Sequence, residues 1–331
     1  MKQLQTDILI DNKLLEEFLN IELYKKLISS KSFKRLKNIA FLGAIDYKYN
    51  NQKRFYRYEH SVGVALLAYY YAKLKNFDKK HTDYLVVAAL LHDIGHPPLS
   101  HSTEFAFKTK FNMHHHKVGI DIIKGKNLLF KDEIKSIINK YEMDEEYICK
   151  LLNKEIDNEL SFVLNNPINV DTIDGISRTY ITQNYRQKYK AGFIYKPVDI
   201  VKALVNKDTK ILNCFWELKD RMYHEFIHHQ ENLLLDEVTK EFVLKCNISE
   251  KEYLQDDKQF FQKYNLNLNI KHLKNREINK EIKFKKRKYF IKGVIINSYN
   301  DFYENYKVDK YEDIIIYQNN LKGHEKCLLI F

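Results

Sequence analysis

The sequence predicts a mainly α-helical protein with a small α+β appendage at its C-terminal end. Glycine and proline are scarce, at 9 and 4 of 331 residues, which disfavours the many turns of a β-sandwich and favours long helices. The composition is 44% hydrophobic and 30% charged, which is the balance of a globular protein rather than a disordered one. Apolar residues recur at helical spacing along most of the first 265 residues.

Helical spacing begins near the N-terminus, within residues 7–28. Residues 59–75 are apolar on nearly every side, which predicts a buried central helix. The next helix is expected over residues 84–93, with Thr82 or Asp83 as its N-terminal cap. Further helices are predicted at 103–109, 116–124, 132–140, 144–153 and 169–184, and one long helix is predicted within 211–246.

The appendage is predicted over residues 266–331. Residues 271–292 are rich in Lys and Arg, and short runs of β-branched and aromatic residues predict strands. We expect these strands at 289–291, 294–296, 314–317 and 327–331. The chain is thus expected to divide into a helical body, residues 1–265, and a basic mixed α+β appendage.

Several classes of protein are excluded by composition and pattern. The sequence lacks the roughly 18 consecutive uncharged apolar residues of a membrane-spanning helix, and its N-terminus has no apolar signal core. Four cysteines, Cys149, Cys214, Cys246 and Cys327, form no CxxC pair. Reduced thiols are therefore expected rather than a disulfide framework or a zinc ribbon. We expect a cytoplasmic protein that has no membrane partner.

The histidines concentrate in one part of the chain, with eight of the thirteen in residues 60–116. His92 and Asp93 stand together at the expected end of an apolar helix, just before Gly95. A histidine taken alone is more often a hydrogen-bonded core residue than a ligand. A carboxylate in such apolar surroundings, however, is costly unless it is paired or metal-bound. An imidazole nitrogen beside a carboxylate oxygen therefore favours a divalent-metal site.

Two further ligands are expected from other helices. His60 begins the preceding apolar helix, which an antiparallel helix pair would bring beside His92, and Asp171 opens a later helix. Mixed nitrogen and oxygen ligands suit Mn, Fe, Co, Ni or Zn, and suit Mg less well. The predicted metal ligands are His60, His92, Asp93 and Asp171.

Two segments that contain these residues resemble a known family. They are residues 57–64, RYEHSVGV, and residues 92–101, HDIGHPPLSH. Both resemble the HD superfamily of metal-dependent phosphohydrolases, and within it the deoxynucleoside triphosphate triphosphohydrolases. The resemblance spans about residues 30–240 and does not reach the appendage. It implies an HD-domain helical bundle, a nucleotide substrate and a homo-oligomer.

The resemblance also implies roles around the metal. His101 would be the acid/base group, oriented by Glu104 one helical turn later. The reaction would be attack of a metal-polarised water on the phosphorus nearest the sugar, which releases nucleoside and triphosphate. Of the run His114, His115 and His116, the sequence favours His116, because Gly119 follows it at the family's spacing. The implied substrate-binding residues are Arg57, His96, His116, Asp174 and Arg178.

Four positions depart from the pattern of this branch. Phe41 replaces a Gln that reads the sugar 3′-hydroxyl, and Thr172, Gly175 and Thr179 replace a Lys, a Tyr and an Asp. These changes leave the metal and acid/base residues intact but alter the nucleotide contacts, so the exact substrate stays open. An HD-type phosphodiesterase or nuclease acting on an oligonucleotide or cyclic nucleotide is the alternative. A non-catalytic nucleic-acid-binding module is a third reading, disfavoured by the intact pair of His101 and Glu104.

The chain carries a formal net charge of +11, with 55 Lys and Arg against 44 Asp and Glu. A polyphosphate pocket accounts for part of this charge, because a positive field steers an anionic substrate. Much of the remainder lies in residues 283–289, KFKKRKY. Such a run is usually a solvated face. Otherwise it would bind a nucleic acid or an anionic regulator.

Overall fold

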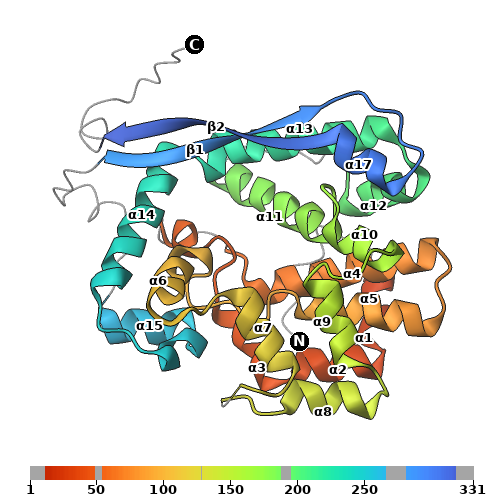
Figure 1. The fold of residues 1–331 in the computed structure, drawn as a ribbon, viewed down its shortest axis with the longest axis horizontal. Helices are drawn as coiled ribbons and strands as arrows, with labels where there is room; N and C mark the ends of the chain where they lie inside the picture. Colours follow the sequence, from red (N-terminus) through yellow and green to blue (C-terminus); the bar gives the residue numbers. More distant parts are fainter. Residues whose placement is uncertain (1–11, 49–53, 128, 188–194, 266–280, 318–331) are drawn as a thin grey trace.

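The computed structural model describes residues 12–48, 54–127, 129–187, 195–265 and 281–317 (Figure 1). Helices make up most of this part of the chain, and the described strands form one two-stranded sheet. The prediction of a mainly α-helical fold is confirmed. Within the described ranges, no helix combines the length and hydropathy needed to cross a membrane.

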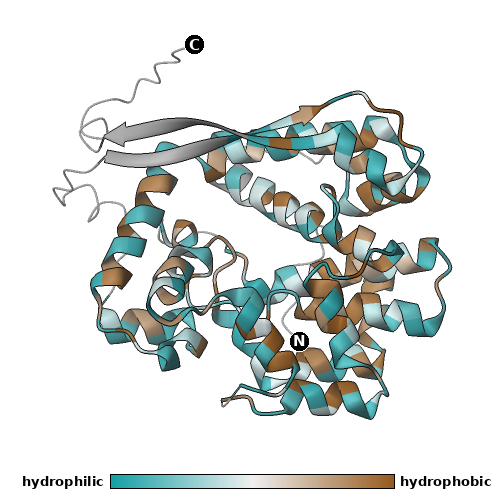
Figure 2. Cartoon of the chain, viewed as in Figure 1, coloured by the Kyte–Doolittle hydropathy of each residue, from teal (hydrophilic) through white to brown (hydrophobic). Residues whose placement is uncertain are grey.

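The central pair of helices is α4 (Arg57–Leu74) and α5 (Lys79–Leu91). Both are buried on nearly every side, as predicted for residues 59–75. Figure 2 shows brown, apolar residues concentrated around this pair. The N-terminal elements that pack beneath them are α1 (Asn12–Leu19), α2 (Glu22–Ser29), α3 (Lys31–Lys34), η1 (Arg35–Asn38) and η2 (Gly43–Tyr47).

Helix α5 begins about one turn earlier than predicted. Its N-terminal cap is Asp78, whose carboxylate accepts a hydrogen bond of 2.8 Å from the backbone N of His81. The predicted caps, Thr82 and Asp83, lie inside the helix, where the Thr82 hydroxyl donates to the Asp78 carbonyl oxygen. An Asp ahead of the first turn satisfies otherwise unpaired backbone donors, which decides where this helix starts.

Helices α6 to α12 surround the central pair. Helix α11 is long and crosses α4, so the start of α11 approaches the end of α5 (Figure 1). These helices are α6 (His101–Phe111), α7 (His115–Ile123), α8 (Glu133–Lys140), α9 (Glu145–Leu152), α10 (Glu159–Asn165), α11 (Val170–Gln187) and α12 (Pro197–Asn206).

The single long helix predicted within 211–246 is interrupted. Helix α13 (Thr209–Met222) leads into a π-helical turn, η3 (Tyr223–Ile227), and α14 (Gln230–Lys245) then follows. The backbone N of His228 donates to the Tyr223 carbonyl oxygen at 2.8 Å, which widens the turn. Neither Gly nor Pro marks this break, so the sequence pattern did not reveal it. The body ends with η4 (Glu250–Leu254) and α15 (Asp257–Tyr264).

The C-terminal segment forms a long antiparallel hairpin of β1 (Glu281–Ile291) and β2 (Tyr306–Tyr317), with α17 (Tyr299–Asn305) in its connection. The hairpin lies along α13 (Figure 1). The strands predicted at 289–291 and 314–317 fall within β1 and β2. Residues 294–296 belong to the connection instead, because the chain turns there toward α17. The strand predicted at 327–331 lies outside the described residues.

Candidate metal centre

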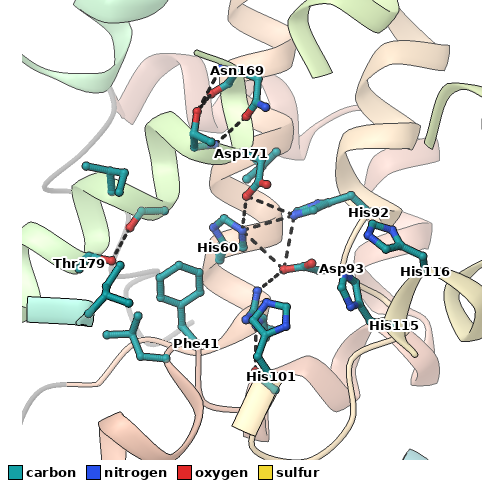
Figure 3. A pocket seen from close by; sticks show the side chains of 18 of the residues that line it. Phe41, His60, His92, Asp93, His101, His115, His116, Asn169, Asp171 and Thr179 are labelled. Carbon is teal, nitrogen blue, oxygen red and sulfur yellow. Dashed lines mark hydrogen bonds and ion pairs between the residues drawn. The ribbon is translucent and has the colours of Figure 1, made fainter. Parts of the chain in front are cut away.

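Four side chains from three helices meet at one point (Figure 3). His60 comes from the first turn of α4, His92 and Asp93 follow the last residue of α5, and Asp171 is the second residue of α11. His60 Nε2 lies 3.0 Å from Asp171 Oδ1, 3.3 Å from His92 Nε2 and 3.5 Å from Asp93 Oδ2. The structure therefore brings together all four predicted ligands.

These separations fit the coordination shell of a divalent ion. Ligand atoms about 2.0–2.2 Å from such an ion lie about 3.0 Å apart at right angles and about 3.4 Å apart at tetrahedral angles. Asp93 Oδ2 is 3.4 Å from His92 Nε2, and Asp171 Oδ1 is 3.8 Å from it. The donor set of two imidazole nitrogens and two carboxylates suits Mn, Fe, Co, Ni or Zn.

The orientation of the two imidazoles supports the same conclusion. His60 Nδ1 donates to Asp174 Oδ2 at 2.7 Å, and His92 Nδ1 donates to the Ala89 carbonyl oxygen at 2.7 Å. Each ring thus turns its Nε2 toward the other ring and toward the carboxylates. Burial opposes protonation of His92, but Asp93 and Asp171 raise its pKa to about 9. The surroundings of this point therefore favour a cation, and a divalent ion bound there would displace that proton.

Asp174 and Arg178 orient His60 from behind. The carboxylate of Asp174 accepts hydrogen bonds from Arg178 Nε at 2.5 Å and from Arg178 Nη2 at 3.0 Å. Both side chains are completely buried, and neither lines the cavity. A Cβ at Gly63 would lie 2.1 Å from Asp174 Oδ1, so glycine is needed there. The family resemblance made Asp174 and Arg178 substrate contacts, whereas the structure places them against a metal ligand.

Arg57 supports the second carboxylate ligand. Its Nη1 donates to Asp93 Oδ2 at 2.7 Å, and its Nε donates to Ser100 Oγ at 2.9 Å. Burial opposes the ionisation of Asp93, yet His92 and Arg57 hold the pKa of this carboxyl well below its usual range. Arg57, predicted to bind phosphate, lines the cavity but has two of its donors committed to this protein-internal network.

A second group of side chains lies beside the ligands. His101 Nδ1 donates to Glu104 Oε2 at 3.0 Å, as the sequence predicted, and His115 Nδ1 donates to Glu104 Oε1 at 2.5 Å. The ring of His96 stacks on His115 at 4.3 Å and an interplanar angle of 10°. His96 Nε2 lies 3.1 Å from Asp93 Oδ1, off the line of a hydrogen bond.

His115 is the member of the histidine run that enters this group, although the sequence favoured His116. Helix α7 is fixed by close packing of two glycines, because a Cβ at Gly95 would lie 2.4 Å from the Gly119 backbone N. His116 lines the cavity beside His115, with 4.0 Å between ring centroids. Helical periodicity could have identified His115, which shares the spacing of the buried residues Val118, Gly119 and Ile122.

The surroundings of Glu104 and His101 shift the pKa of each side chain through different physical causes. Burial opposes the ionisation of Glu104, but hydrogen bonds from His101 and His115 hold its pKa below the usual range. Desolvation lowers the pKa of His101, although the bond to Glu104 opposes the shift. Desolvation also lowers the pKa of His116 to about 4 and that of His96 well below its usual value. A charged carboxylate thus contacts His101, whose imidazole remains neutral near neutral pH.

Both groups open into one cavity of about 500 Å³, a size typical of small-molecule sites. Another part of the cavity wall comes from the later helices. Burial lowers the pKa of Lys219 to about 8, with Asp171 opposing the shift, and burial raises the pKa of Asp236 to about 6. The residues of this wall are Thr172, Gly175 and Thr179 of α11, Lys219 of α13, Tyr223 of η3 and Asp236 of α14.

Comparison with known proteins agrees with this geometry. Residues 57–161 match the family model described as the HD domain, a segment that contains His60, His92 and Asp93. An uncharacterized protein of Methanocaldococcus jannaschii is 28% identical over 248 residues, which cover 72% of this chain and 48% of that protein. An uncharacterized Mycoplasma pneumoniae protein is 30% identical over 189 residues, which cover 54% and 44%. The chain thus spans about half the length of these relatives.

A third similar protein is the uncharacterized protein YwfO of Bacillus subtilis, which is 25% identical over 185 residues, covering 54% of this chain and 39% of that protein. The HD match supports the HD-domain phosphohydrolase superfamily and, in general terms, a metal-dependent hydrolase. The cluster of His60, His92 and Asp171, with Asp93 beside the two histidines, is consistent with that class.

Proposed function

We propose that this protein is a metal-dependent phosphohydrolase that converts a (deoxy)nucleoside triphosphate into nucleoside and triphosphate. One observation carries the proposal: the four predicted ligands and His101, which is bonded to Glu104, line the same cavity. The HD match supports the general class of enzyme, and the family resemblance together with the cations of the cavity supports the substrate.

The residues have separable tasks in this reaction. A divalent ion held by the four ligands would neutralise phosphate charge and lower the pKa of a water molecule. Water attacks the phosphorus nearest the sugar, the bond from phosphorus to the sugar oxygen breaks, and that oxygen leaves with the electron pair and takes up a proton. Because Nδ1 of His101 is held by Glu104, Nε2 is the atom that takes or gives this proton. Glu104 stabilises the imidazolium form.

A cation for the polyphosphate comes from α13. Thr172, which replaces the family's Lys, bonds instead to the capping residue Asn169: its hydroxyl accepts from the Asn169 backbone N at 3.0 Å, and its own backbone N donates to Asn169 Oδ1 at 2.7 Å. Lys219 lines the same cavity and is buried, and its Nζ donates to the Pro167 carbonyl oxygen at 3.1 Å. An ammonium group has three donors, so others remain for phosphate oxygens.

The sugar side of the cavity is open. A Cβ at Gly175 would lie 3.4 Å from Phe41 Cζ and 3.8 Å from His60 Cε1, which are ordinary contacts. Packing therefore does not require glycine there, and its absent side chain enlarges the cavity. With apolar Phe41 in place of a hydrogen-bonding residue, we propose that the site discriminates weakly between ribose and deoxyribose.

The test is product analysis. Purified protein is incubated with Mn²⁺ and each dNTP, each NTP or short single-stranded DNA, and products are separated by ion-pair chromatography. Nucleoside and triphosphate are expected, and mononucleotides from DNA would instead identify the phosphodiesterase alternative. His92→Ala and Asp93→Ala should abolish hydrolysis, while His81→Ala, exposed at the start of α5, should not. Hydrolysis that survives both ligand substitutions would contradict the metal assignment.

A further inference from the structure

The C-terminal hairpin reaches the wall of the metal cavity through side chains of β1, chiefly that of Tyr289. The buried ring of Tyr289, on β1, lies 5.3 Å from the ring of Trp216 and 5.1 Å from the ring of Tyr223. It also lies 5.5 Å from Lys219 Nζ. Lys219 and Tyr223 both line the cavity, whereas Tyr289 stands behind them.

The hairpin is fixed to α13 by polar bonds from both strands. Trp216 Nε1 donates to the Phe290 carbonyl oxygen at 3.0 Å, and the Tyr289 backbone N donates to Asp220 Oδ1 at 3.3 Å. From β2, the Tyr306 hydroxyl donates to Asn213 Oδ1 at 2.9 Å. The position of Tyr289 against the cavity wall is therefore determined by several directional contacts.

Lys219 needs this support because it is buried without a carboxylate. Among the described residues, no acidic side chain lies within ion-pair distance of its Nζ, and the charged groups that face it are Asp171 from α11 and Arg287 from β1. Its ammonium is instead placed by the Pro167 carbonyl oxygen and by the faces of Trp216, at 4.6 Å, and Tyr289. A buried cation held by aromatic faces lacks a counter-ion, which an anionic substrate would supply.

We propose that the hairpin belongs to the substrate site, with Tyr289 as a positioning residue that holds Lys219 and Tyr223 in the cavity wall for polyphosphate binding. The inference rests on the proposed function for the identity of the substrate. The π-helical turn that begins at Tyr223 lies at this contact, and such turns are frequent at functional sites. Arg287, from the basic run, lies over the Tyr223 ring at 5.5 Å and so belongs to the same arrangement.

Tryptophan fluorescence can report binding at this wall, because Trp216 is the one tryptophan of the chain and its ring lies 4.6 Å from Lys219 Nζ. Inorganic tripolyphosphate is titrated into the full chain while tryptophan fluorescence is recorded. The Kd is expected to rise about tenfold or more in Lys219→Met and in Tyr289→Leu. Tyr289→Phe keeps the aromatic face and should bind within about twofold of the wild type.

The matched control is Tyr306→Leu. Tyr306 belongs to the same hairpin and its ring lies 5.3 Å from Trp216, so its loss should lower Tm as much as Tyr289→Leu but leave the Kd unchanged. With a nucleoside triphosphate, Tyr289→Leu should raise KM about tenfold and leave kcat within about twofold. Equal loss of affinity in both variants, or wild-type affinity in Tyr289→Leu, would overturn the inference.

A measurement on the wild type is independent of whether a variant folds. Tripolyphosphate should slow amide hydrogen exchange in residues 287–291 of β1, and unchanged exchange would also overturn the inference. The two proposals fail differently. Wild-type protein that binds tripolyphosphate in this pattern but hydrolyses no nucleotide would refute the proposed function and leave the hairpin inference standing. Hydrolysis of a nucleotide to nucleoside and triphosphate, with no effect of Tyr289→Leu on binding, would refute the hairpin inference and leave the proposed function standing.

Discussion

Replacing Asp174 by Asn should weaken metal binding although Asp174 is not a ligand. The carboxylate accepts from His60 Nδ1 at 2.7 Å and from Arg178 Nε at 2.5 Å. An Asn cannot serve both partners. If its NH₂ group faces His60, the proton of the imidazole moves to Nε2, the atom that binds the metal. If its oxygen faces His60, the NH₂ group meets the guanidinium of Arg178.

The magnitude follows from these two contacts. Loss of the group that orients a metal-bound histidine lowers metal affinity by about 10- to 100-fold, which is about 1.4 to 2.7 kcal/mol. Arg178 is fully buried, and removal of a buried ionic partner lowers the free energy of unfolding by about 3 kcal/mol. The two effects are distinct, because affinity is measured on folded protein and stability on the metal-free chain.

Titration calorimetry with Mn²⁺ measures the affinity, and urea unfolding in EDTA measures the stability. Ser177→Ala is the matched control, since Ser177 is buried one turn further along α11 and its hydroxyl donates to the Ile173 carbonyl oxygen at 2.7 Å. That variant should lose about 1 kcal/mol of stability and keep wild-type affinity. A folded Asp174→Asn protein with the wild-type Kd for Mn²⁺ would refute the role assigned to Asp174.

Four further predictions concern neighbouring parts of the site. Gly63→Ala should lower Mn²⁺ affinity and Tm, because its Cβ would lie 2.1 Å from Asp174 Oδ1, whereas Gly119→Ala, whose Cβ would have 3.7 Å to its nearest neighbour, should change neither in the same assays. Glu104→Gln should lower kcat by about tenfold or more at unchanged Mn²⁺ affinity, and unchanged steady-state kinetics would contradict the role of the pair. Tripolyphosphate affinity should fall as the pH rises through about 8, the pKa of Lys219, because only the protonated amine binds phosphate, and Lys219→Arg should remove this dependence. The unfolded chain holds that proton to higher pH, so the free energy of unfolding should rise with pH above about 8 in wild type relative to Lys219→Met.

Local signals explain what could be predicted from the sequence. His92 and Asp93 are adjacent at the end of an apolar helix, and His60 lies on the preceding helix. These three residues were enough to predict a metal centre. The buried helix at 59–75 was also predictable from a local pattern, because a run that is apolar on nearly every side of a helix indicates a helix buried in the core. Helix ends were harder to predict. Asp78, Thr82 and Asp83 are all suitable caps for α5, and the structure shows that the Asp78 carboxylate accepts the hydrogen bond from the His81 backbone N.

Other features depend on contacts between distant segments. His115 and His116 both line the cavity, and His115 is the one that bonds to Glu104, in a helix whose position is fixed by the close packing of Gly95 and Gly119. The spacing rule applied to the run of three histidines therefore identified one of these two residues and missed the other. Asp174 and Arg178 were assigned to the substrate from the family resemblance, whereas in the structure Asp174 bonds to both His60 and Arg178. The break between α13 and α14 has no Gly or Pro to announce it, since a π-helical turn needs neither.

The departures from the family pattern and the unexplained basic segment meet at one place in the structure. Thr172 removes a cation from the start of α11, and Lys219 of α13 lines the same cavity. A buried lysine without a carboxylate partner is stable only where its surroundings are fixed, and here Tyr289 of the hairpin contributes to fixing them. A cation supplied from α13 depends on the appendage, because Tyr289 helps to place it. Phosphate binding and the hairpin should therefore be lost or retained together.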